Sequence, residues 1–324
     1  MKAVVRDRYG SADVLRTTET GKPAVRDGEA LVRVHAASLN TADSDHLSGR
    51  PRLARIGTGL VRPRTGRVGL DVAGTVEEVG RGVTGLRPGD EVWADLFAHG
   101  HGSLAEYVCA AASAFAPKPT GVSFEEAAAV PHSGVLALQA LRPGRAIRDG
   151  DQVLIVGAGG CVGPFAVQIA KAYGAEVTAV DHGGKLDLLR KLGADHVVDY
   201  TREDITASGR RYDRILDIAE SRSVLSYRRC LRSGGRYVLI ARTLRGFAGA
   251  ALFGGVISLA SDKHMGVFGW RPNVRADLDM LADLLEQGLV TPHIDRRFGL
   301  DQAADAFRYL QSGHARGKVL VMPS

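Results

Sequence analysis

Along the first third of the chain, apolar residues alternate with polar ones in short runs that Gly, Pro and Asp residues separate. This pattern is typical of β-strands joined by turns. The predicted strands lie at residues 2–7, 29–38, 73–80, 89–94 and 104–110. We therefore expect a compact, mostly antiparallel first domain that extends to about residue 116.

After residue 118 the pattern changes to one of helices and buried strands. Ser123 is followed three residues later by Glu126, a capping box that marks the start of a helix. Between residues 150 and 269, apolar runs alternate with helical segments; the predicted strands are 152–157, 175–180, 195–200, 212–218 and 235–240. Such alternation predicts a parallel sheet with helices on both faces.

The end of the chain, from about residue 276, predicts two amphipathic helices and a final strand. The most apolar segment, residues 246–260, is shorter than the roughly 20 residues that span a bilayer. We expect it to form a buried or interface helix, and we expect no stable membrane insertion.

Composition narrows the class of protein. With 324 residues, of which 45% are hydrophobic and 24% charged, the chain can bury a full core and is long enough for two domains. The net charge of +6 comes from basic residues spread along the chain, with no basic strip that contains aromatic residues, so nucleic acid is not an expected partner. The three cysteines are far apart, and the N-terminus has no long apolar run, so we expect a cytoplasmic protein.

A glycine-rich turn follows the predicted strand at 152–157. Gly157 permits a tight turn, Gly160 lets backbone approach a phosphate, and Gly163 lets the next helix lie close to the sheet. The helix start offers N–H groups and a positive dipole end to a pyrophosphate. The order strand, turn, helix and strand is the Rossmann dinucleotide-binding pattern, and its predicted cofactor-binding residues are Gly157, Gly159, Gly160, Cys161, Val162 and Gly163.

Residues after the next strand bear on the choice of dinucleotide. Asp181 can accept hydrogen bonds from an adenosine ribose and repel a 2′-phosphate, which favours NADH. Lys185 and Tyr200, beside His182, can instead hold a 2′-phosphate, which favours NADPH, unless they are an exposed lysine and a strand-end tyrosine. On balance Asp181 favours NADH, and NADPH remains open.

Ordered motifs point to a family. Residues 69–92, then 102–108, the glycine turn and finally residues 312–321 together resemble the medium-chain dehydrogenase/reductase superfamily, specifically its zinc-independent quinone oxidoreductase-like branch. The resemblance covers essentially the whole chain. It implies an α/β protein with a GroES-like, mostly-β catalytic domain (1–118 and 273–324), a doubly wound parallel-sheet Rossmann domain (119–272), and a homodimer.

The residues that zinc-dependent members use are missing. Where those members have Gly-His-Glu, this chain has Gly69-Leu70-Asp71, and it lacks both the early catalytic cysteine and the four-cysteine cluster. We interpret His99 and His101 as part of a solvated turn and expect no metal. A conjugated acceptor suits a metal-free site, because negative charge that forms on hydride addition is delocalised toward an oxygen. The resemblance thus implies NAD(P)H-dependent reduction of a quinone or other conjugated enone.

The resemblance also implies site residues in the first domain. Asn40 and Asp43 stand at the places of an Asn-x-x-Asp segment that contributes to the nicotinamide and substrate cleft, and Asp45 occupies a place where many quinone reductases have a tyrosine. His132 replaces an apolar residue and, beside Ser133, is either a proton donor or a residue that packs at a helix turn.

Further residues follow from family position. Ala241 and Arg242 are expected at the carboxyl edge of the sheet. Phe268 and Gly269 are expected beside the nicotinamide carboxamide, and Lys318 is expected near the cofactor. Trp270 is either a wall of the substrate pocket or an ordinary core residue.

Two questions stay open at this point. Residues 50–67 contain six arginines and no acidic residue, so they either attract an anionic substrate or form a solvated loop. Alternative functions are an enoyl-thioester or natural-product-specific reductase and, outside enzymes, a dinucleotide-binding structural or RNA-binding protein.

Overall fold

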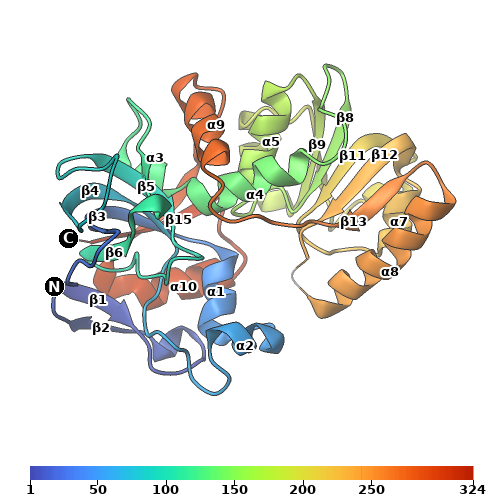
Figure 1. The fold of residues 1–324 in the computed structure, drawn as a ribbon. Coiled ribbons are helices and arrows are strands. Elements are labelled where there is room, and N and C mark those ends of the chain that lie inside the picture. The colour runs from blue at the N-terminus through green and yellow to red at the C-terminus, as the bar shows by residue number, and fades with distance from the viewer. Residues whose placement is uncertain (242, 324) are drawn as a thin grey trace. The chain divides into compact units, whose positions relative to one another are not determined.

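The structure, a computed structural model, describes residues 1–241 and 243–323 and divides into two compact units (Figure 1). The first unit comprises Met1–Val135, Arg271–Gly288 and Pro292–Ser324, and the second comprises Leu136–Trp270 and Leu289–Thr291. Both ends of the chain therefore contribute to the first unit. The division predicted at residues 118 and 273 stays a prediction; the units divide within helix α4 and at Arg271.

The first unit is built on a mostly antiparallel sheet with the order β14-β15-β3-β4-β5-β7, in which β6 also pairs with β3. Only the pair β14 and β15 is parallel, and β1 and β2 form a separate hairpin-like pair. The strands are β1 (Lys2–Val5), β2 (Arg16–Glu19), β3 (Glu29–Leu39), β4 (Asp71–Val79), β5 (Glu91–Asp95), β6 (Tyr107–Ala111), β7 (Ala116–Pro117), β14 (Ile294–Gly299) and β15 (Lys318–Met322). The mostly antiparallel first domain is confirmed.

Helices lie around this sheet: α1 (Thr41–Ser48), α2 (Arg55–Thr58), α3 (Phe124–Ala128), α9 (Arg275–Glu286) and α10 (Ala303–Gln311). Helix α3 begins at the predicted capping box, in which the Glu126 N–H donates to Ser123 Oγ at 3.2 Å and the Ser123 N–H donates to the Glu126 carboxylate at 2.9 Å. The core of the unit joins alternate residues of the long strands, such as Val32 and Val34, to Phe307 of α10 and Val319 of β15.

The second unit is a parallel sheet with the order β10-β9-β8-β11-β12-β13. Its strands are β8 (Gln152–Val156), β9 (Glu176–Asp181), β10 (His196–Asp199), β11 (Tyr212–Asp217), β12 (Leu231–Leu239) and β13 (His264–Val267), and its helices are α4 (Pro131–Leu141, which begins in the first unit), α5 (Gly163–Ala172), α6 (Leu186–Lys191), α7 (Val224–Arg228) and α8 (Leu244–Ala260). Figure 1 shows α5 on one side of this sheet and α7 and α8 on the other. The predicted doubly wound parallel sheet is therefore confirmed.

Some strands, β2 and β14 among them, were not predicted. Strand β14 reads Ile-Asp-Arg-Arg-Phe-Gly and is largely exposed, and β2 is a polar edge strand, so neither shows clear apolar alternation. Pairing with a buried neighbour, β15 in the case of β14, determines these strands more than their own residues do.

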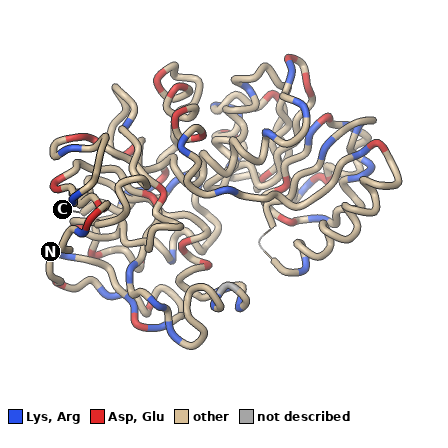
Figure 2. The backbone as a smooth tube through the Cα atoms, in the orientation of Figure 1, with Lys and Arg blue, Asp and Glu red and all other residues tan. Residues whose placement is uncertain are grey.

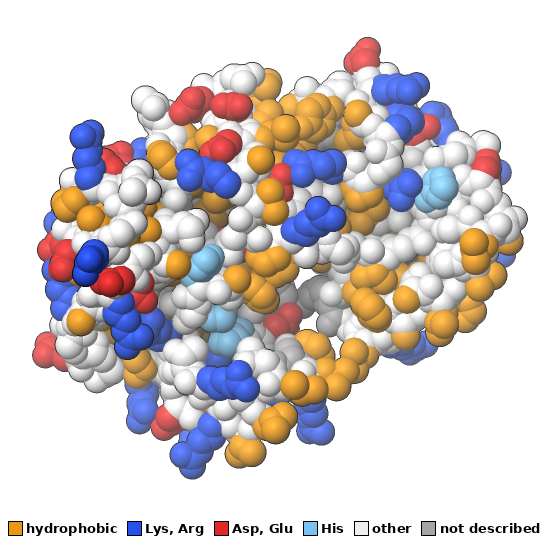
Figure 3. Space-filling model, in the orientation of Figure 1, with side chains coloured by type: hydrophobic (Ala, Val, Ile, Leu, Met, Phe, Trp, Pro, Cys, Tyr) orange, Lys and Arg blue, Asp and Glu red, His pale blue; other side chains and the backbone are white. Residues whose placement is uncertain are grey.

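The apolar segment at residues 246–260 forms the predicted helix, α8, but much of this helix is exposed. Its exposed large side chains are Leu244, Phe247, Leu252, Phe253, Val256 and Leu259, and Figure 3 shows hydrophobic side chains gathered over this helix. The buried alternative is wrong, and the interface alternative remains. Among the residues described, no helix is both long and apolar enough to cross a bilayer.

Candidate functional site

The glycine turn of the second unit joins β8 to α5 and has the backbone geometry that its three glycines predict. Gly157 has φ +81°, which favours glycine. A Cβ on Gly163 would lie 2.2 Å from the carbonyl oxygen of Ala158, so only glycine lets α5 begin this close to the turn. At Gly160 the nearest atom to an added Cβ is 3.8 Å away, which leaves this side of the turn open.

Asp181, the last residue of β9, holds the turn in place. Its side chain is buried, and one carboxylate oxygen accepts the Gly159 N–H at 2.7 Å while the other accepts the His182 N–H at 2.8 Å. The ammonium group of Lys185 lies 3.8 Å away. Both oxygens of this carboxylate thus have a donor, and a lysine balances its charge.

The other residues predicted around the ribose gather beside Asp181. Lys185 packs over Gly159, where an added Cβ would lie 2.7 Å from the lysine Cδ. Tyr200 is exposed, its N–H donates to the Asp181 carbonyl at 3.3 Å, and its ring lies edge-on to the His182 ring at 6.3 Å. The structure therefore brings Asp181, His182, Lys185 and Tyr200 together next to the turn.

The remaining predicted residues of this unit lie at the turn or beyond the strands. Cys161 is buried and Val162 is half-buried just before α5. Ala241 follows β12, and Phe268, whose N–H donates to the Leu239 carbonyl at 2.8 Å, follows β13; the half-buried Trp270 and the exposed Gly269 come next. Arg242 lies outside the described residues.

These observations fit a dinucleotide. A parallel strand ends in a tight turn, a helix begins close behind it, and the open side of Gly160 offers backbone to a phosphate. The residues that would hold the pyrophosphate are those of the turn, and those beside the ribose are Asp181, Lys185 and Tyr200.

A buried polar network lies in the first unit, where β3, β4, α1, α4 and β15 come together. Asn40 is its centre: its side-chain amide donates to Asp71 at 2.9 Å, and its side-chain oxygen accepts from Ser133 Oγ at 2.7 Å and from Lys318 Nζ at 2.5 Å. Lys318 also lies 3.2 Å from Asp71, and Ser38 Oγ donates to the same carboxylate at 3.0 Å. Because these side chains are almost fully buried, the network fixes the Asn40 amide in one orientation.

His132 forms a second buried pair with Asp95, the last residue of β5. Its Nδ1 lies 2.8 Å from the Asp95 carboxylate, and its backbone N–H, in the first turn of α4, donates to Asp71 at 2.9 Å. Burial by itself lowers the pKa of His132, but the carboxylates of Asp95, Asp71 and Asp43 outweigh it and raise the pKa above its ordinary value. Burial opposes ionisation of Asp95, yet His132 and the Phe97 N–H hold the pKa of that carboxyl below its ordinary value. Each group of the pair therefore favours the charged form of the other.

Asp43 lies next to this network. It accepts the Asn40 N–H at 2.8 Å, but its other oxygen is buried with no hydrogen-bond partner among the described residues. Burial raises the pKa of Asp43 to about 7; the Asn40 N–H and the charges of His132 and Lys318 oppose this shift, and Asp71 adds to it. Asp43 can thus hold a proton near neutral pH.

The interpretation of His101 as part of a solvated turn is wrong. His101 is buried, with φ +61°, and its ring stacks on that of His46 at 4.0 Å. Burial lowers the pKa of His101 to about 4 and that of His46 to about 3. Both rings are therefore neutral at neutral pH. His99, in contrast to His101, is only half-buried. The stacking of His101 on His46 could not be predicted from the sequence, in which His101 is only one of two histidines in a glycine-containing loop.

The remaining predictions in the first unit concern Asp45 and the arginine-rich segment at residues 50–67. Asp45 is half-buried on α1, two residues beyond Asp43. Of the six arginines at residues 50–67, Arg55 donates to the carbonyls of Gly49 and Ser48 and lies over the Tyr9 ring at 4.5 Å. Figure 2 shows basic and acidic residues interspersed along both units.

The residues of the first-unit network do not suit a metal ion. Asp71 already accepts from Asn40, Ser38 and the ammonium of Lys318, and the Nδ1 of His132 faces a carboxylate. A cation beside Asp71 would meet the charge of Lys318. Across residues 1–241 and 243–323, no group of three or more His, Cys, Asp or Glu side chains is placed to hold a metal.

Sequence reasoning placed Asn40, Asp43, His132 and Lys318 at a site but missed two carboxylates that join them, Asp71 and Asp95. A signal for both was available. Asp71 begins β4 between the apolar Leu70 and Val72, and Asp95 ends β5 after Trp93 and Ala94; a carboxylate is buried at such places only with a partner.

Comparison with known families gives two matches. A model described as "Alcohol dehydrogenase GroES-like domain" matches residues 26–140, and one described as "Zinc-binding dehydrogenase" matches residues 192–321.

Comparison with individual proteins gives full-length similarity. The chain is 35% identical to the mitochondrial NAD(P)H oxidoreductase RTN4IP1 of Mus musculus, covering 99% of this chain and 89% of that protein. It is 33% identical to the chloroplastic NADPH-dependent alkenal/one oxidoreductase of Arabidopsis thaliana, covering 100% of this chain and 80% of that protein. Among solved structures, the quinone oxidoreductase from Coxiella burnetii superposes with a TM-score of 0.87 at 30% identity and covers 99% of each chain.

Proposed function

This chain belongs to the medium-chain dehydrogenase/reductase superfamily, and from that premise we propose that it is an NAD(P)H-dependent reductase of quinones or other conjugated enones. The observation that carries the proposal is the turn from β8 to α5. Gly163 can have no side chain there, and Gly160 presents open backbone at the start of a helix. Of the relatives reported above, one is named a quinone oxidoreductase and one an alkenal/one oxidoreductase.

The bound cofactor would supply a hydride to the acceptor. The chain itself must then stabilise negative charge on the acceptor oxygen and provide a proton. We propose that His132 provides this proton, because the Asp95 carboxylate in contact with its imidazole favours the protonated form. Since Nδ1 faces Asp95, the proton would leave from Nε2.

Asn40 is proposed to orient the acceptor or the nicotinamide. Its side-chain oxygen already accepts two hydrogen bonds, and one of its two amide N–H groups donates to Asp71. The second amide N–H is the donor left for a ligand. Lys318, predicted as a cofactor residue, is proposed to act through Asn40 as a positioning residue, because its ammonium group is buried against Asn40, Asp71 and Ser133.

We propose that the reaction needs no metal. The support is that both carboxylates already have a partner: the ammonium group of Lys318 lies 3.2 Å from Asp71, and Nδ1 of His132 lies 2.8 Å from Asp95. Reduction of a conjugated acceptor can use hydrogen-bond donors and a proton for the charge that zinc would otherwise stabilise.

For the dinucleotide we propose that NADPH is accepted. A carboxylate that points at the ribose would repel a 2′-phosphate, but both Asp181 oxygens accept backbone N–H groups and Lys185 balances their charge. Lys185 and the exposed Tyr200 lie beside it as donors.

The test is the loss of reduced-cofactor absorbance with NADPH and NADH in parallel, against a panel of quinones and enones, with and without a chelator. Turnover that the chelator leaves unchanged supports the proposal, and the ratio of kcat/KM for the two cofactors decides between them. Dinucleotide binding without turnover on any acceptor would contradict it and favour a non-catalytic role.

We also propose that the protein is a homodimer. Strand β13 is an edge of the second-unit sheet, and α8, which packs on it through Ser258 and Met265, exposes a continuous apolar face. A second copy that pairs at this edge would cover both. A single monomer mass in analytical ultracentrifugation at micromolar concentration would contradict the dimer.

A further inference from the structure

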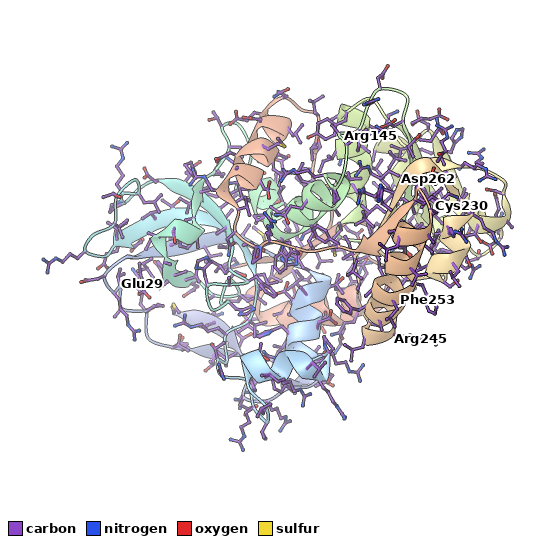
Figure 4. The ribbon with its side chains drawn as sticks, turned by 45° about the vertical axis from the view of Figure 1, so that its right-hand side comes forward. Glu29, Arg145, Cys230, Arg245, Phe253 and Asp262 are labelled. Atoms are coloured by element: carbon purple, nitrogen blue, oxygen red, sulfur yellow. The ribbon has the colours of Figure 1, made fainter. Side chains whose placement is uncertain are left out.

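A small hollow opens at the amino-terminal edge of the second-unit sheet. It measures about 200 Å³ and is lined by Arg145, Asp151, Asp213, Arg214, Gly234, Arg236 and His264. Pockets for whole drug-sized ligands measure roughly 300–1,000 Å³, so this one suits a smaller group. Arg145 is labelled in Figure 4 at this end of the unit.

Three basic side chains form a row across the sheet. Arg214 of β11 pairs in register with Arg236 of β12, and Arg236 pairs with His264 of β13. Side chains at one register level of neighbouring strands point to the same face, so the three are direct neighbours. Like charges in such positions destabilise a sheet unless something balances them.

The two guanidinium groups of the row have no carboxylate partner. Arg214 is buried and donates only to backbone carbonyls, those of Pro143 at 2.8 Å and Arg145 at 2.7 Å. The Arg236 side chain lies against Gly144, where an added Cβ would be 2.5 Å from the arginine Nε, and among the described residues its guanidinium has no hydrogen-bond or ion-pair partner. Burial, and then the charges of Arg236 and Arg145, lower the pKa of Arg214 to about 10. The hollow is therefore electropositive.

The two carboxylates of the lining do not neutralise it. Asp151 forms a bidentate pair with Arg145, at 2.5 and 2.7 Å, and accepts the Arg148 N–H. Asp213 pairs with Arg232 at 2.8 Å and accepts the Gln152 N–H at 2.9 Å. After these pairs are formed, the charges of Arg214 and Arg236 remain.

We propose that this hollow binds a small oxyanion, a phosphate group, between the Arg236 guanidinium and the imidazole of His264. Planar guanidinium groups bind phosphate oxygens with two parallel hydrogen bonds, and the anion would relieve the repulsion within the basic row. The site is separate from the dinucleotide turn, since Arg214 lies near the start of β11 whereas Gly157 follows the end of β8, and parallel strands place these at opposite edges of the sheet.

The source of the phosphate is either the free ion or a phosphate monoester. The test measures the Tm of the full chain, without cofactor, in sodium phosphate, in glycerol phosphate, and in sodium chloride at equal ionic strength. Either phosphate compound is expected to raise the Tm by about 2 °C or more above the chloride value at concentrations well above Kd. The compound that acts at the lower concentration identifies the source.

Three variants locate the binding. Arg236→Gln is expected to lose the phosphate response, and Arg245→Gln, an equal charge change on α8 (Figure 4), is expected to keep it. Arg236→Glu places a carboxylate against the basic row, so its Tm without phosphate should exceed that of the wild type and phosphate should not raise it further.

Three results would overturn the proposal. One is a wild-type Tm that rises no more in phosphate than in chloride. Another is a full phosphate response in Arg236→Gln or Arg236→Glu. The third is loss of the wild-type response when saturating NADPH is present, because phosphate would then bind at the cofactor turn.

Discussion

The Nδ1 atom of His132 lies 2.8 Å from the carboxylate of Asp95, and both side chains are more than nine-tenths buried. The carboxylate of Asp95, which is in contact with the imidazole, and those of Asp71 and Asp43 raise the pKa of His132 against the opposing effect of burial. The raised pKa favours the protonated imidazole, which is the form that a general acid needs.

Replacing His132 with Gln is expected to lower kcat by about 10²-fold or more, the usual contribution of a positioned acid. The half-buried His99, replaced with Gln in the same way, serves as the control and should leave kcat unchanged. Steady-state kinetics with a quinone and an enone measure both. An unchanged kcat in His132→Gln would show that His132 only packs at the start of α4.

Asp95→Asn tests the same pair through pH. The variant removes the carboxylate that raises the pKa of His132, so the imidazole should lose its proton at lower pH than in the wild type. The alkaline limb of the pH profile of kcat is therefore expected to move to lower pH. A loss of kcat with no movement of that limb would mean that Asp95 acts on the structure alone.

Stability should also depend on pH through Asp43. Because burial raises the pKa of this carboxyl from 3.8 to about 7, the folded chain keeps a proton there at pH values where the unfolded chain has lost it. The contribution of Asp43 to the free energy of unfolding is thus greatest at low pH and falls as pH rises from 3.8 to about 7.

Asp43→Asn removes this titration, while its amide oxygen can still accept the Asn40 N–H. Denaturant unfolding at a series of pH values should show the stability of Asp43→Asn improving relative to the wild type as pH rises through that window. A constant difference between the two proteins at all pH values would mean that Asp43 ionises normally.

Sequence reasoning reached the fold because local signals agreed with the final structure. The alternating runs became β1, β3, β4, β5 and β6, and the Ser123 capping box begins α3. It also placed Asn40, Asp43, His132 and Lys318 at a site. The hydrogen bond from Lys318 to Asn40 could not be predicted from the sequence, because the pairing of β15 with β3 brings these two residues together.

Other features depend on tertiary contacts that no local pattern contains. The carboxylate of Asp181 turns back to the Gly159 N–H, and His101 stacks on His46 in the core. The apolar residues of α8 suggested burial, but apolarity alone does not show whether a helix faces its own core or another molecule.

The pair of Asp71 and Lys318 should show the behaviour of a buried ion pair. Asp71→Leu or Lys318→Met each leaves one charge buried without a partner, which typically costs about 3–5 kcal/mol of unfolding free energy. The double variant should cost less than the sum, because neither charge remains. Breaking the exposed pair of Lys2 and Asp301 is the control and should cause no measurable change. Additive losses for Asp71 and Lys318 would contradict their coupling.

The glycine turn gives a pair of variants with different outcomes. Gly163→Ala would bring its Cβ against the Ala158 carbonyl, so it should lower both the Tm and the affinity for dinucleotide. Gly160→Ala meets no atom closer than 3.8 Å and should fold normally, yet lose affinity because the methyl group blocks a phosphate. Isothermal titration with NADPH measures this, and an undiminished affinity in Gly160→Ala would place the phosphates elsewhere.

The central claim is hydride transfer from the dinucleotide to a conjugated acceptor. The most direct measurement uses NADPH or NADH that carries deuterium at the transferred C4 position, an enone as acceptor, a chelator in the buffer, and mass spectrometry and NMR of the product. We predict one deuterium on the β-carbon of a saturated ketone. Deuterium on the carbinol carbon of an alcohol, or a reduced product without deuterium, would contradict the account.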